Sequence, residues 1–187
     1  LQDDDEILCR LYSIAGKFCS HPLDSDSDND GLKDGEEYHG KTVNGTTYFT
    51  NPIDQDTDGD GLSDGLELGV SYEDIWTDMA YNLQPCLTKT GGQLTNCLET
   101  WQSDEDPETT TDPRNVDSDS DTLEDGVEDS NANGKLDSSE TAPDLADTDG
   151  GGRSDSEELS TDSTDPRNPD DDINDGDGDG LYDHIED

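Results

Sequence analysis

The fold of this chain is decided at residues 56–67, which have the sequence Asp56-Thr57-Asp58-Gly59-Asp60-Gly61-Leu62-Ser63-Asp64-Gly65-Leu66-Glu67. Acidic side chains stand at positions 1, 3, 5, 9 and 12 of this stretch, and glycine stands at position 6. Ca²⁺ takes about six to eight oxygen ligands, and a twelve-residue loop supplies them from these positions and from the main-chain carbonyl at position 7. Glycine at position 6 allows the sharp bend that turns alternate side chains inward. The stretch therefore predicts a calcium loop.

The same pattern occurs at five further places. We number the six stretches in order as loop 1 (residues 26–37), loop 2 (56–67), loop 3 (117–128), loop 4 (129–140), loop 5 (147–158) and loop 6 (175–186). Loops 1, 2 and 6 match the pattern fully. Thr122 replaces the glycine of loop 3, two Asn side chains replace carboxylates in loop 4, and Gly151 replaces the fifth-position carboxylate of loop 5. We expect strain in loop 3, weaker binding in loop 4 and the poorest site in loop 5.

Each loop is expected to bind one ion through the same ligand positions, with the position-12 Glu as a bidentate ligand. The predicted ligands of loops 1 to 3 are Asp26, Asp28, Asp30, Leu32, Asp34, Glu37, Asp56, Asp58, Asp60, Leu62, Asp64, Glu67, Asp117, Asp119, Asp121, Leu123, Asp125 and Glu128. Those of loops 4 to 6 are Asp129, Asn131, Asn133, Lys135, Asp137, Glu140, Asp147, Asp149, Asp155, Glu158, Asp175, Asp177, Asp179, Leu181, Asp183 and Glu186. Leu and Lys contribute main-chain carbonyls. The expected cofactor is Ca²⁺, at about six ions.

An acidic chain can produce such patterns by chance. With 52 acidic residues and 19 glycines among 187 residues, the full pattern is expected on the order of a few hundredths of a time. Three complete matches are present, so the spacing favours calcium loops over an unliganded acidic run.

The composition indicates how such a chain can fold. Its net charge is −43, only 25% of its residues are hydrophobic and 5% are aromatic. So little apolar surface cannot form a large core, and repulsion among the carboxylates opposes collapse. Metal binding should therefore drive folding. We expect a mostly irregular, calcium-stabilised repeat array of EF-hand-like acidic loops, with short helical turns and little β-structure.

The same composition excludes several classes of function. Nine Lys and Arg residues cannot form the basic patches that bind nucleic acids or anionic membranes. No hydrophobic run approaches the ~20 residues that a membrane-spanning helix needs. The well-placed carboxylates are assigned as metal ligands, and the HExxH motif of zinc proteases is absent from the sequence. An enzyme is therefore not expected.

The cysteines lie in two local pairs along the sequence, and we expect disulfides between Cys9 and Cys19 and between Cys86 and Cys97. These disulfides are the simplest of the three possible connectivities. A zinc site is the alternative, but the spacing within each pair is too long for one, and the three His residues are well separated. Disulfides together with acidic calcium loops indicate an oxidising, calcium-rich extracellular location.

A proline stands four residues before the first ligand of loops 1, 2, 3 and 5, at Pro22, Pro52, Pro113 and Pro143. Proline favours an extended entry and ends any preceding helix. The repeated unit is therefore an extended entry, an acidic loop and a helical turn that carries the position-12 Glu. Gly40 and Gly69 are placed to end two of these turns.

The loops occupy residues 24–68 and 113–187, and two other segments lie outside them. Residues 1–23 predict an apolar-faced helix and contain the first cysteine pair. Residues 69–112 predict a small disulfide-bonded helical insertion with both tryptophans, followed by a solvated acidic connection at residues 104–112. Asn44-Gly45 predicts a hairpin turn, although Asn44-Gly45-Thr46 is also a glycosylation acceptor pattern.

Loops of the form Asp-x-Asp-x-Asp-Gly-Leu-x-Asp-Gly-x-Glu, joined by Asn-Pro or Asp-Pro linkers, resemble the bacterial and archaeal branch of thrombospondin type 3 repeats. The resemblance covers most of residues 24–68 and 113–187. It implies calcium-binding strings of loops, with little regular secondary structure, in extracellular and surface proteins. It also implies extra ligands two residues before a loop, here Asp24 and Asp54. Asn115, Leu145 and Ile173 depart from that pattern.

EF-hand loops share these ligand positions but place an aliphatic residue at position 8 for strand pairing. Loops 1, 2, 3 and 6 have leucine at position 7 instead. Leu136 of loop 4 is at position 8, so loop 4 resembles an EF-hand or dockerin loop, yet no long helix is expected beside it. A calcium sensor that opens a groove is therefore not expected.

These features predict an extracellular structural protein that Ca²⁺ makes rigid, acting as a subunit of a head-to-tail filament or surface fibre. The apolar helix at the start of the chain and the last loop at its end are expected to meet between molecules. The alternatives are a stalk, spacer or adhesion segment of a larger cell-surface protein, and a calcium-dependent accessory domain of a secreted enzyme. A simple calcium buffer would need neither ordered loops nor disulfides. The expected partner is a second copy of the chain or another surface protein.

Overall fold

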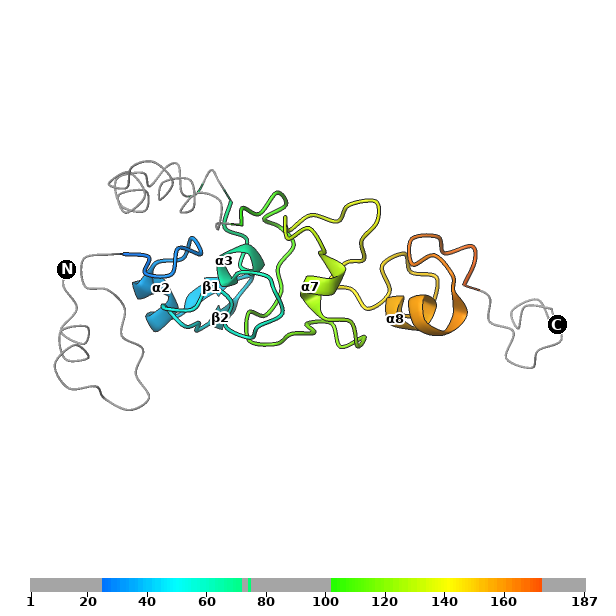
Figure 1. Cartoon of the computed structure of the whole chain (residues 1–187), viewed down its shortest axis with the longest axis horizontal. Helices are drawn as coiled ribbons and strands as arrows, with labels where there is room; N and C mark the ends of the chain where they lie inside the picture. The colour runs from blue at the N-terminus through cyan, green and yellow to red at the C-terminus, as the bar shows by residue number, and fades with distance from the viewer. Residues whose placement is uncertain (1–24, 72–73, 75–101, 173–187) are drawn as a thin grey trace.

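The computed structural model describes residues 25–71, 74 and 102–172 (Figure 1). Several predictions lie outside these residues: the N-terminal helix, the helices of the insertion, the extra ligand Asp24, loop 6 and the cysteines Cys9, Cys19, Cys86 and Cys97.

The helices of the loops begin at position 9. They are α2 (Asp34–His39) in loop 1, α3 (Asp64–Glu67) in loop 2, α7 (Asp125–Glu128) in loop 3 and α8 (Asp155–Glu157) in loop 5, which continues as the π-helical turn η1 (Glu158–Asp162). A carboxylate in the first turn favours a helix start, because the N–H groups there have no partner inside the helix. The predicted helical turns with the position-12 Glu are confirmed in α2, α3 and α7. Gly40 and Gly69 follow α2 and α3 with φ values of 92° and 75°.

A short hairpin follows α2. Strands β1 (Lys41–Val43) and β2 (Thr46–Tyr48) pair antiparallel, with Val43 opposite Thr46. Asn44 and Gly45 form the turn with φ values of 50° and 86°, a region that these two residue types adopt readily. The predicted hairpin turn is confirmed.

The apolar core is small, as the composition predicts. Leu32, Leu68 and Val70 are buried together, and Val43 and Tyr48 of the hairpin pack against them. Within the described ranges, no helix has both the length and the apolar character needed to cross a membrane. Apolar burial on this scale stabilises one end of the molecule and leaves the acidic loops to be held by other interactions.

A main-chain hydrogen bond closes four of the loops. The N–H at position 9 donates to the carbonyl of the residue before position 1: Asp34 to Ser25 at 3.0 Å, Asp64 to Gln55 at 2.8 Å, Asp125 to Val116 at 2.9 Å and Asp155 to Ala146 at 3.1 Å. The bond brings position 9 of each loop back to the point where the loop begins.

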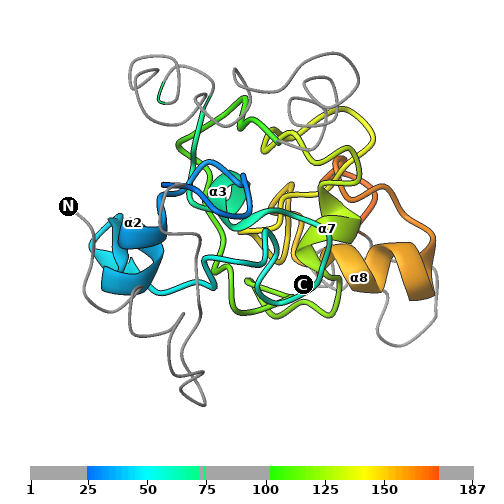
Figure 2. The same ribbon diagram turned by 60° about the vertical axis from the view of Figure 1, so that its left-hand side comes forward.

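Loops 1, 2, 3 and 5 follow one another along the long axis of the molecule, and the order α2, α3, α7, α8 is kept in both views (Figures 1 and 2). Neighbours share one contact, in which the position-10 N–H donates to the position-5 carboxylate of the preceding loop. The pairs are Gly65 with Asp30 at 3.1 Å, Gly126 with Asp60 at 3.2 Å and Ser156 with Asp121 at 2.9 Å. We call these four loops the stacking line. Loop 5 follows loop 3 in it, so loop 4 stands to the side.

Residues 102–112, which follow the insertion, rejoin the stacking line beside loop 2. The N–H of Asp104 donates to the carbonyl of Val70 at 3.1 Å, and that of Thr111 donates to the carbonyl of Glu67 at 3.1 Å. The chain therefore returns beside α3, and loop 3 contacts loop 2 as loop 2 contacts loop 1. The prediction that residues 104–112 form a solvated connection is wrong at Asp104, which is only 3% exposed. Its carboxylate packs against Gly134 of loop 4. Residues 105–108 are exposed, as expected.

Candidate metal centre

The position-1 carboxylates hold the loops in a curved shape by accepting main-chain hydrogen bonds from inside the loop. In loop 2, Asp56 accepts hydrogen bonds from the N–H groups of Gly59 at 2.7 Å and Gly61 at 3.0 Å. Asp26 in loop 1 and Asp147 in loop 5 accept the same pair of bonds from positions 4 and 6. Both donor positions have positive φ in these loops. The sequence predicted the bend at position 6 but missed the one at position 4, where Asn, Gly, Ser or Ala stands.

Thr122 occupies the bend of loop 3 with a φ of 87°. A β-branched residue in this region is strained, because its side chain crowds the following peptide. The predicted strain is confirmed. The N–H of Thr122 still donates to Asp117, at 3.1 Å, so the loop keeps its curl.

The curled loops gather carboxylate oxygens at single points. In loops 1, 2 and 3, one oxygen from each of positions 1, 3 and 5 lies within 4.8 Å of the other two: Asp26, Asp28 and Asp30; Asp56, Asp58 and Asp60; Asp117, Asp119 and Asp121. Two further groups cross between loops, Asp30 and Glu37 with Asp64, and Asp60 and Glu67 with Asp125. These clusters could each hold a metal ion, and the crossing groups join neighbours of the stacking line.

Many of these oxygens are buried without a hydrogen-bond partner among the described residues. They belong mainly to positions 3 and 12: both oxygens of Asp28, Oδ2 of Asp58, Asp119 and Asp149, Oε2 of Glu37 and Glu67, and both oxygens of Glu128 and Glu158. A buried carboxylate oxygen without a donor is costly, since it has lost its water and gained nothing in return. The oxygens without partners therefore lie at positions that the loop pattern predicts to be cation ligands.

The pKa values of the position-12 residues also show that a buried negative charge is unfavourable at these sites. Burial, followed by the charge of Asp30, raises the pKa of Glu37 to about 10. Burial and the charge of Asp60 raise the pKa of Glu67 to about 10 as well. Burial raises the pKa of Glu128 to about 8. Without a cation, the folded chain therefore favours protonated Glu at these positions.

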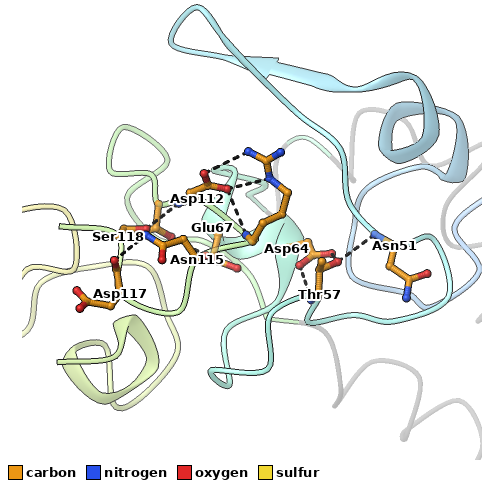
Figure 3. A network of polar contacts seen from close by, with 10 residues as sticks. Asn51, Thr57, Asp64, Glu67, Asp112, Asn115, Asp117 and Ser118 are labelled. Atoms are coloured by element: carbon orange, nitrogen blue, oxygen red, sulfur yellow. Dashed lines mark hydrogen bonds and ion pairs between the residues drawn. The ribbon is translucent and has the colours of Figure 1, made fainter. Parts of the chain in front are cut away.

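Position 9 has a different role from the other ligand positions. Asp64 accepts hydrogen bonds from the N–H of Thr57 at 2.8 Å on one oxygen and from its hydroxyl at 2.6 Å on the other (Figure 3). Asp34 and Asp155 are held in the same way by Ser27 and Thr148, and Asp125 accepts the N–H of Ser118 at 2.8 Å. All four position-9 carboxylates thus fasten their loops, and Asp64 and Asp125 also belong to the clusters that cross between loops.

Two positions that the sequence analysis missed support this arrangement. The position-2 hydroxyl also accepts the N–H of a linker residue: Thr57 from Asn51 at 3.0 Å and Ser118 from Asp112 at 2.8 Å (Figure 3). Thr148 accepts the N–H of Ala142 at 2.9 Å in the same way. A linker threonine then donates to the position-12 Glu of the preceding loop, Thr50 to Glu37 at 3.2 Å and Thr111 to Glu67 at 2.9 Å. The signal was present, since Thr stands two residues before Pro52, Pro113 and Pro143.

Position 10 explains a glycine that the calcium pattern does not require. A Cβ atom on Gly65 or Gly126 would overlap the main-chain carbonyl oxygen of Asp30 or Asp60 in the preceding loop. Glycine therefore allows two backbones to touch. Ser156 takes this place in loop 5, and its hydroxyl donates to the carbonyl of Asp121.

Loop 4 satisfies its own carboxylates. The side-chain amide of Asn131 donates to Asp137 at 3.0 Å and to Glu140 at 2.8 Å, and that of Asn133 donates to Asp137 at 3.2 Å. Glu140 also accepts the N–H groups of Asn131 at 3.2 Å and Asp137 at 3.1 Å. The predicted ligands of loop 4 are therefore brought together, but as donors and acceptors of one hydrogen-bond network.

The remaining predicted ligands are placed less centrally. Asp54 is exposed, and its main-chain N–H faces the carboxylate of Asp28. Leu32, Leu62 and Leu123, predicted as carbonyl ligands, donate their N–H groups to the position-5 carboxylates at 2.7, 2.8 and 2.7 Å. Lys135 donates its N–H to the side-chain oxygen of Asn133 at 3.0 Å.

Comparisons with known protein families, with curated proteins and with solved structures gave no match for this chain. The assignment of function therefore depends on the chemistry of the loops.

Proposed function

We propose that the chain is an extracellular, calcium-binding structural protein of the thrombospondin type 3 repeat kind, in which ions hold successive loops in a stiff array. The observation that carries this proposal is the set of buried, partnerless carboxylate oxygens at positions 3 and 12 of the stacking line. A bound cation would supply the partner that these oxygens lack. It would also offset the repulsion that opposes folding of so acidic a chain.

Calcium is the cation that the donor set favours. The clusters consist of carboxylate oxygens, which hard cations prefer, whereas zinc prefers nitrogen and sulfur. Magnesium demands near-ideal octahedral geometry and keeps several waters, while calcium accepts larger and less regular sets of oxygens. The carboxylate clusters lie within the loops and also between neighbouring loops. Such large and irregular sets of oxygens suit calcium better than magnesium.

The structural role rests on how the loops meet. Loops 2 and 3 each present a position-5 carboxylate to the following loop and a position-10 N–H to the preceding one, so their two faces differ. Unlike faces that repeat in one direction give a head-to-tail arrangement, which extends between molecules if the same contact forms there. This favours a filament or surface-fibre subunit. A stalk or spacer within a larger surface protein would use the same stacking inside one chain.

Calcium titration of the metal-free full chain tests the proposal, with circular dichroism and calorimetry as readouts and MgCl₂ as the matched control. We expect calcium to order the chain with dissociation constants of about 10⁻⁴–10⁻³ M or tighter, the range of extracellular calcium modules, and magnesium to do so much less well. An unchanged spectrum and no heat of binding at about 10 mM calcium would contradict it.

Sedimentation velocity in millimolar calcium tests the filament role separately. We expect polymers that grow with protein concentration and disappear on chelation. The double variant Leu8→Lys, Leu11→Lys should prevent growth while leaving calcium binding intact. A full chain that stays monomeric at every concentration would contradict the filament role and leave the stalk role in place.

A further inference from the structure

We propose that loop 5 is a complete calcium site, because Asp172, which lies beyond the loop in sequence, supplies the carboxylate that Gly151 lacks. This inference rests on the calcium binding proposed for the other loops. It assigns a ligand that the twelve-residue pattern does not contain. It also reverses the expectation that loop 5 is the poorest of the six sites.

The first observation is the position of the Asp172 carboxylate. A Cβ atom on Gly151 would overlap Oδ2 of Asp172 and would lie 2.9 Å from Oδ1 of Asp149. The Asp172 carboxylate therefore occupies the space into which a position-5 side chain would project. In the other loops of the stacking line, this space belongs to Asp30, Asp60 and Asp121.

The second observation is that Asp172 makes the hydrogen bond of a position-5 residue. In loops 1 to 3, the position-7 N–H donates to the position-5 carboxylate at 2.7 to 2.8 Å. In loop 5, the position-7 residue is Arg153, and its N–H donates to Oδ2 of Asp172 at 3.3 Å. The same donor is therefore used with a carboxylate from elsewhere in the chain.

The third observation points to a cation. Glu158, at position 12, is 0% exposed, and both of its carboxylate oxygens lack a hydrogen-bond partner among the described residues. Its nearest charged neighbours include the carboxylates of Asp172 and Asp149. Oδ1 of Asp172 and Oδ2 of Asp149 are also buried and partnerless. Three carboxylates thus face one another with unused oxygens, and the Thr164 hydroxyl beside Glu158 cannot neutralise their charge, which a divalent cation would do.

The segment after α8 is built to bring Asp172 back. Ser163 follows η1 with a φ of 58°, a left-handed conformation that reverses the chain. Arg167 then anchors the returning segment, because its guanidinium donates to the carbonyls of Asp137 at 2.5 Å and Glu140 at 3.0 Å. Two turn bonds, from Asn168 to Asp165 at 2.9 Å and from Asp171 to Asn168 at 3.1 Å, complete the return. The segment is seen beside α8 and η1 in Figures 1 and 2.

The resulting ligand set matches that of the other loops. Asp147 and Asp149 supply positions 1 and 3, Asp172 takes the place of position 5, and Glu158 supplies position 12. Four carboxylates of this kind suit Ca²⁺. Because Asp172 comes from the segment that Arg167 ties to loop 4, a cation here would also fasten loop 5 to the chain that follows it.

Counting calcium ions on the full chain by native mass spectrometry, alongside calcium titration, tests the inference. Asp172→Asn should lower the saturated count by one ion or weaken one site by at least tenfold. The matched control is Asp170→Asn, an exposed neighbour that should change neither. The double variant Gly151→Asp, Asp172→Gly should restore the ion, since it moves the carboxylate back to position 5 of the loop.

The outcomes separate this inference from the proposed function. If the unaltered chain binds no calcium, both fail. If it binds calcium and Asp172→Asn keeps every ion at unchanged affinity, the role of Asp172 is wrong and the proposed function stands. If Asp172→Asn loses more than one ion and the double variant does not recover them, Asp172 supports the fold and is not a ligand, which also overturns the inference.

Discussion

Loops 2 and 4 share one sequence pattern and differ in how they satisfy it. In loop 2, Asp58 and Glu67 keep buried oxygens without a donor. In loop 4, Asn131 and Asn133 replace carboxylates, and their amides donate to Asp137 and Glu140. An amide brings donors as well as an oxygen, so two Asn residues turn a cluster of like charges into a closed hydrogen-bond network. The comparison teaches that the pattern sets the curl of a loop, whereas the charge at positions 3 and 5 sets its need for a cation.

The two loops also differ in what they contact. Loop 2 stacks on loop 1 through Gly65, and loop 3 stacks on loop 2 through Gly126. Loop 4 packs against the returning connection instead, where the N–H of Glu105 donates to the carbonyl of Asn133 at 2.8 Å and the hydroxyl of Thr109 to that of Gly134 at 2.8 Å. The loops that demand a cation are therefore those that stack.

The largest expected effect is that of pH on the metal-free protein. Glu37 and Glu67 have folded-state pKa values of about 10, raised chiefly by burial, against an ordinary value of 4.5. A raised pKa means that the folded state binds the proton more tightly than the unfolded state does. The stabilisation is fully present below pH 4.5 and is lost as the pH rises toward about 10.

Urea unfolding of the metal-free chain at about pH 5, 7 and 9, followed by circular dichroism, measures this effect. We expect the free energy of unfolding to fall as the pH rises, with the loss centred on loops 1 and 2. Saturating calcium should reverse the trend, because protons then compete with the ion for the same oxygens. A metal-free chain whose stability increases with pH would contradict the account.

The second effect distinguishes loop 2 from loop 4 by how a Glu→Gln substitution changes the free energy of unfolding with and without calcium. Glu67→Gln should cost about 3–5 kcal/mol in calcium, the scale for removing one member of a buried charge pair, yet it should stabilise the metal-free chain. Glu140→Gln should cost about 1.5–3 kcal/mol with or without calcium, because Glu140 accepts hydrogen bonds within loop 4. Chemical unfolding of both variants in calcium and in chelator provides the measurement. The same calcium dependence in the two variants would remove the distinction between the loops.

The smallest effect concerns stacking. Gly65→Ala should destabilise the calcium-bound chain by about 1–3 kcal/mol, because its Cβ would overlap the carbonyl oxygen of Asp30. Gly35 is the matched control at position 10 of loop 1, since a Cβ there meets nothing within 4 Å among the described residues. Gly35→Ala should be neutral or stabilising by about 0.4–1 kcal/mol. If Gly65→Ala and Gly35→Ala destabilise the chain equally in thermal unfolding, glycine at position 10 is needed for the conformation of the loop and not for the contact between loops.

The sequence was sufficient for features that depend on neighbouring residues. Ligand spacing, the bend at position 6, the helical turn with Glu67 and the Asn44-Gly45 hairpin are all local, and each was predicted. The strain at Thr122 followed from the same reasoning. Local spacing determines these features because a twelve-residue loop closes on itself.

Features that join distant segments were missed. Nothing local to loop 5 indicates Asp172, and the order of the loops does not reveal that loop 5 stacks directly on loop 3. Part of the signal was available: a Thr-x-Pro linker precedes loops 2, 3 and 5, whereas loop 4 follows loop 3 without one. Because Thr50 and Thr111 bind the preceding Glu, this linker marks the loops that stack.

Amide hydrogen exchange of the full chain in millimolar calcium and in excess chelator tests the central claim most directly. The N–H groups of Gly65 and Gly126 report on stacking, because each donates to the carboxylate of the preceding loop, and that of Gly134 reports on loop 4, where it donates to Asp129 at 2.7 Å. We expect the protection of Gly65 and Gly126 to be present in calcium and lost in chelator, with a smaller loss at Gly134. Equal protection of Gly65 and Gly126 in both conditions would show that the loops stack without a cation and would contradict the account.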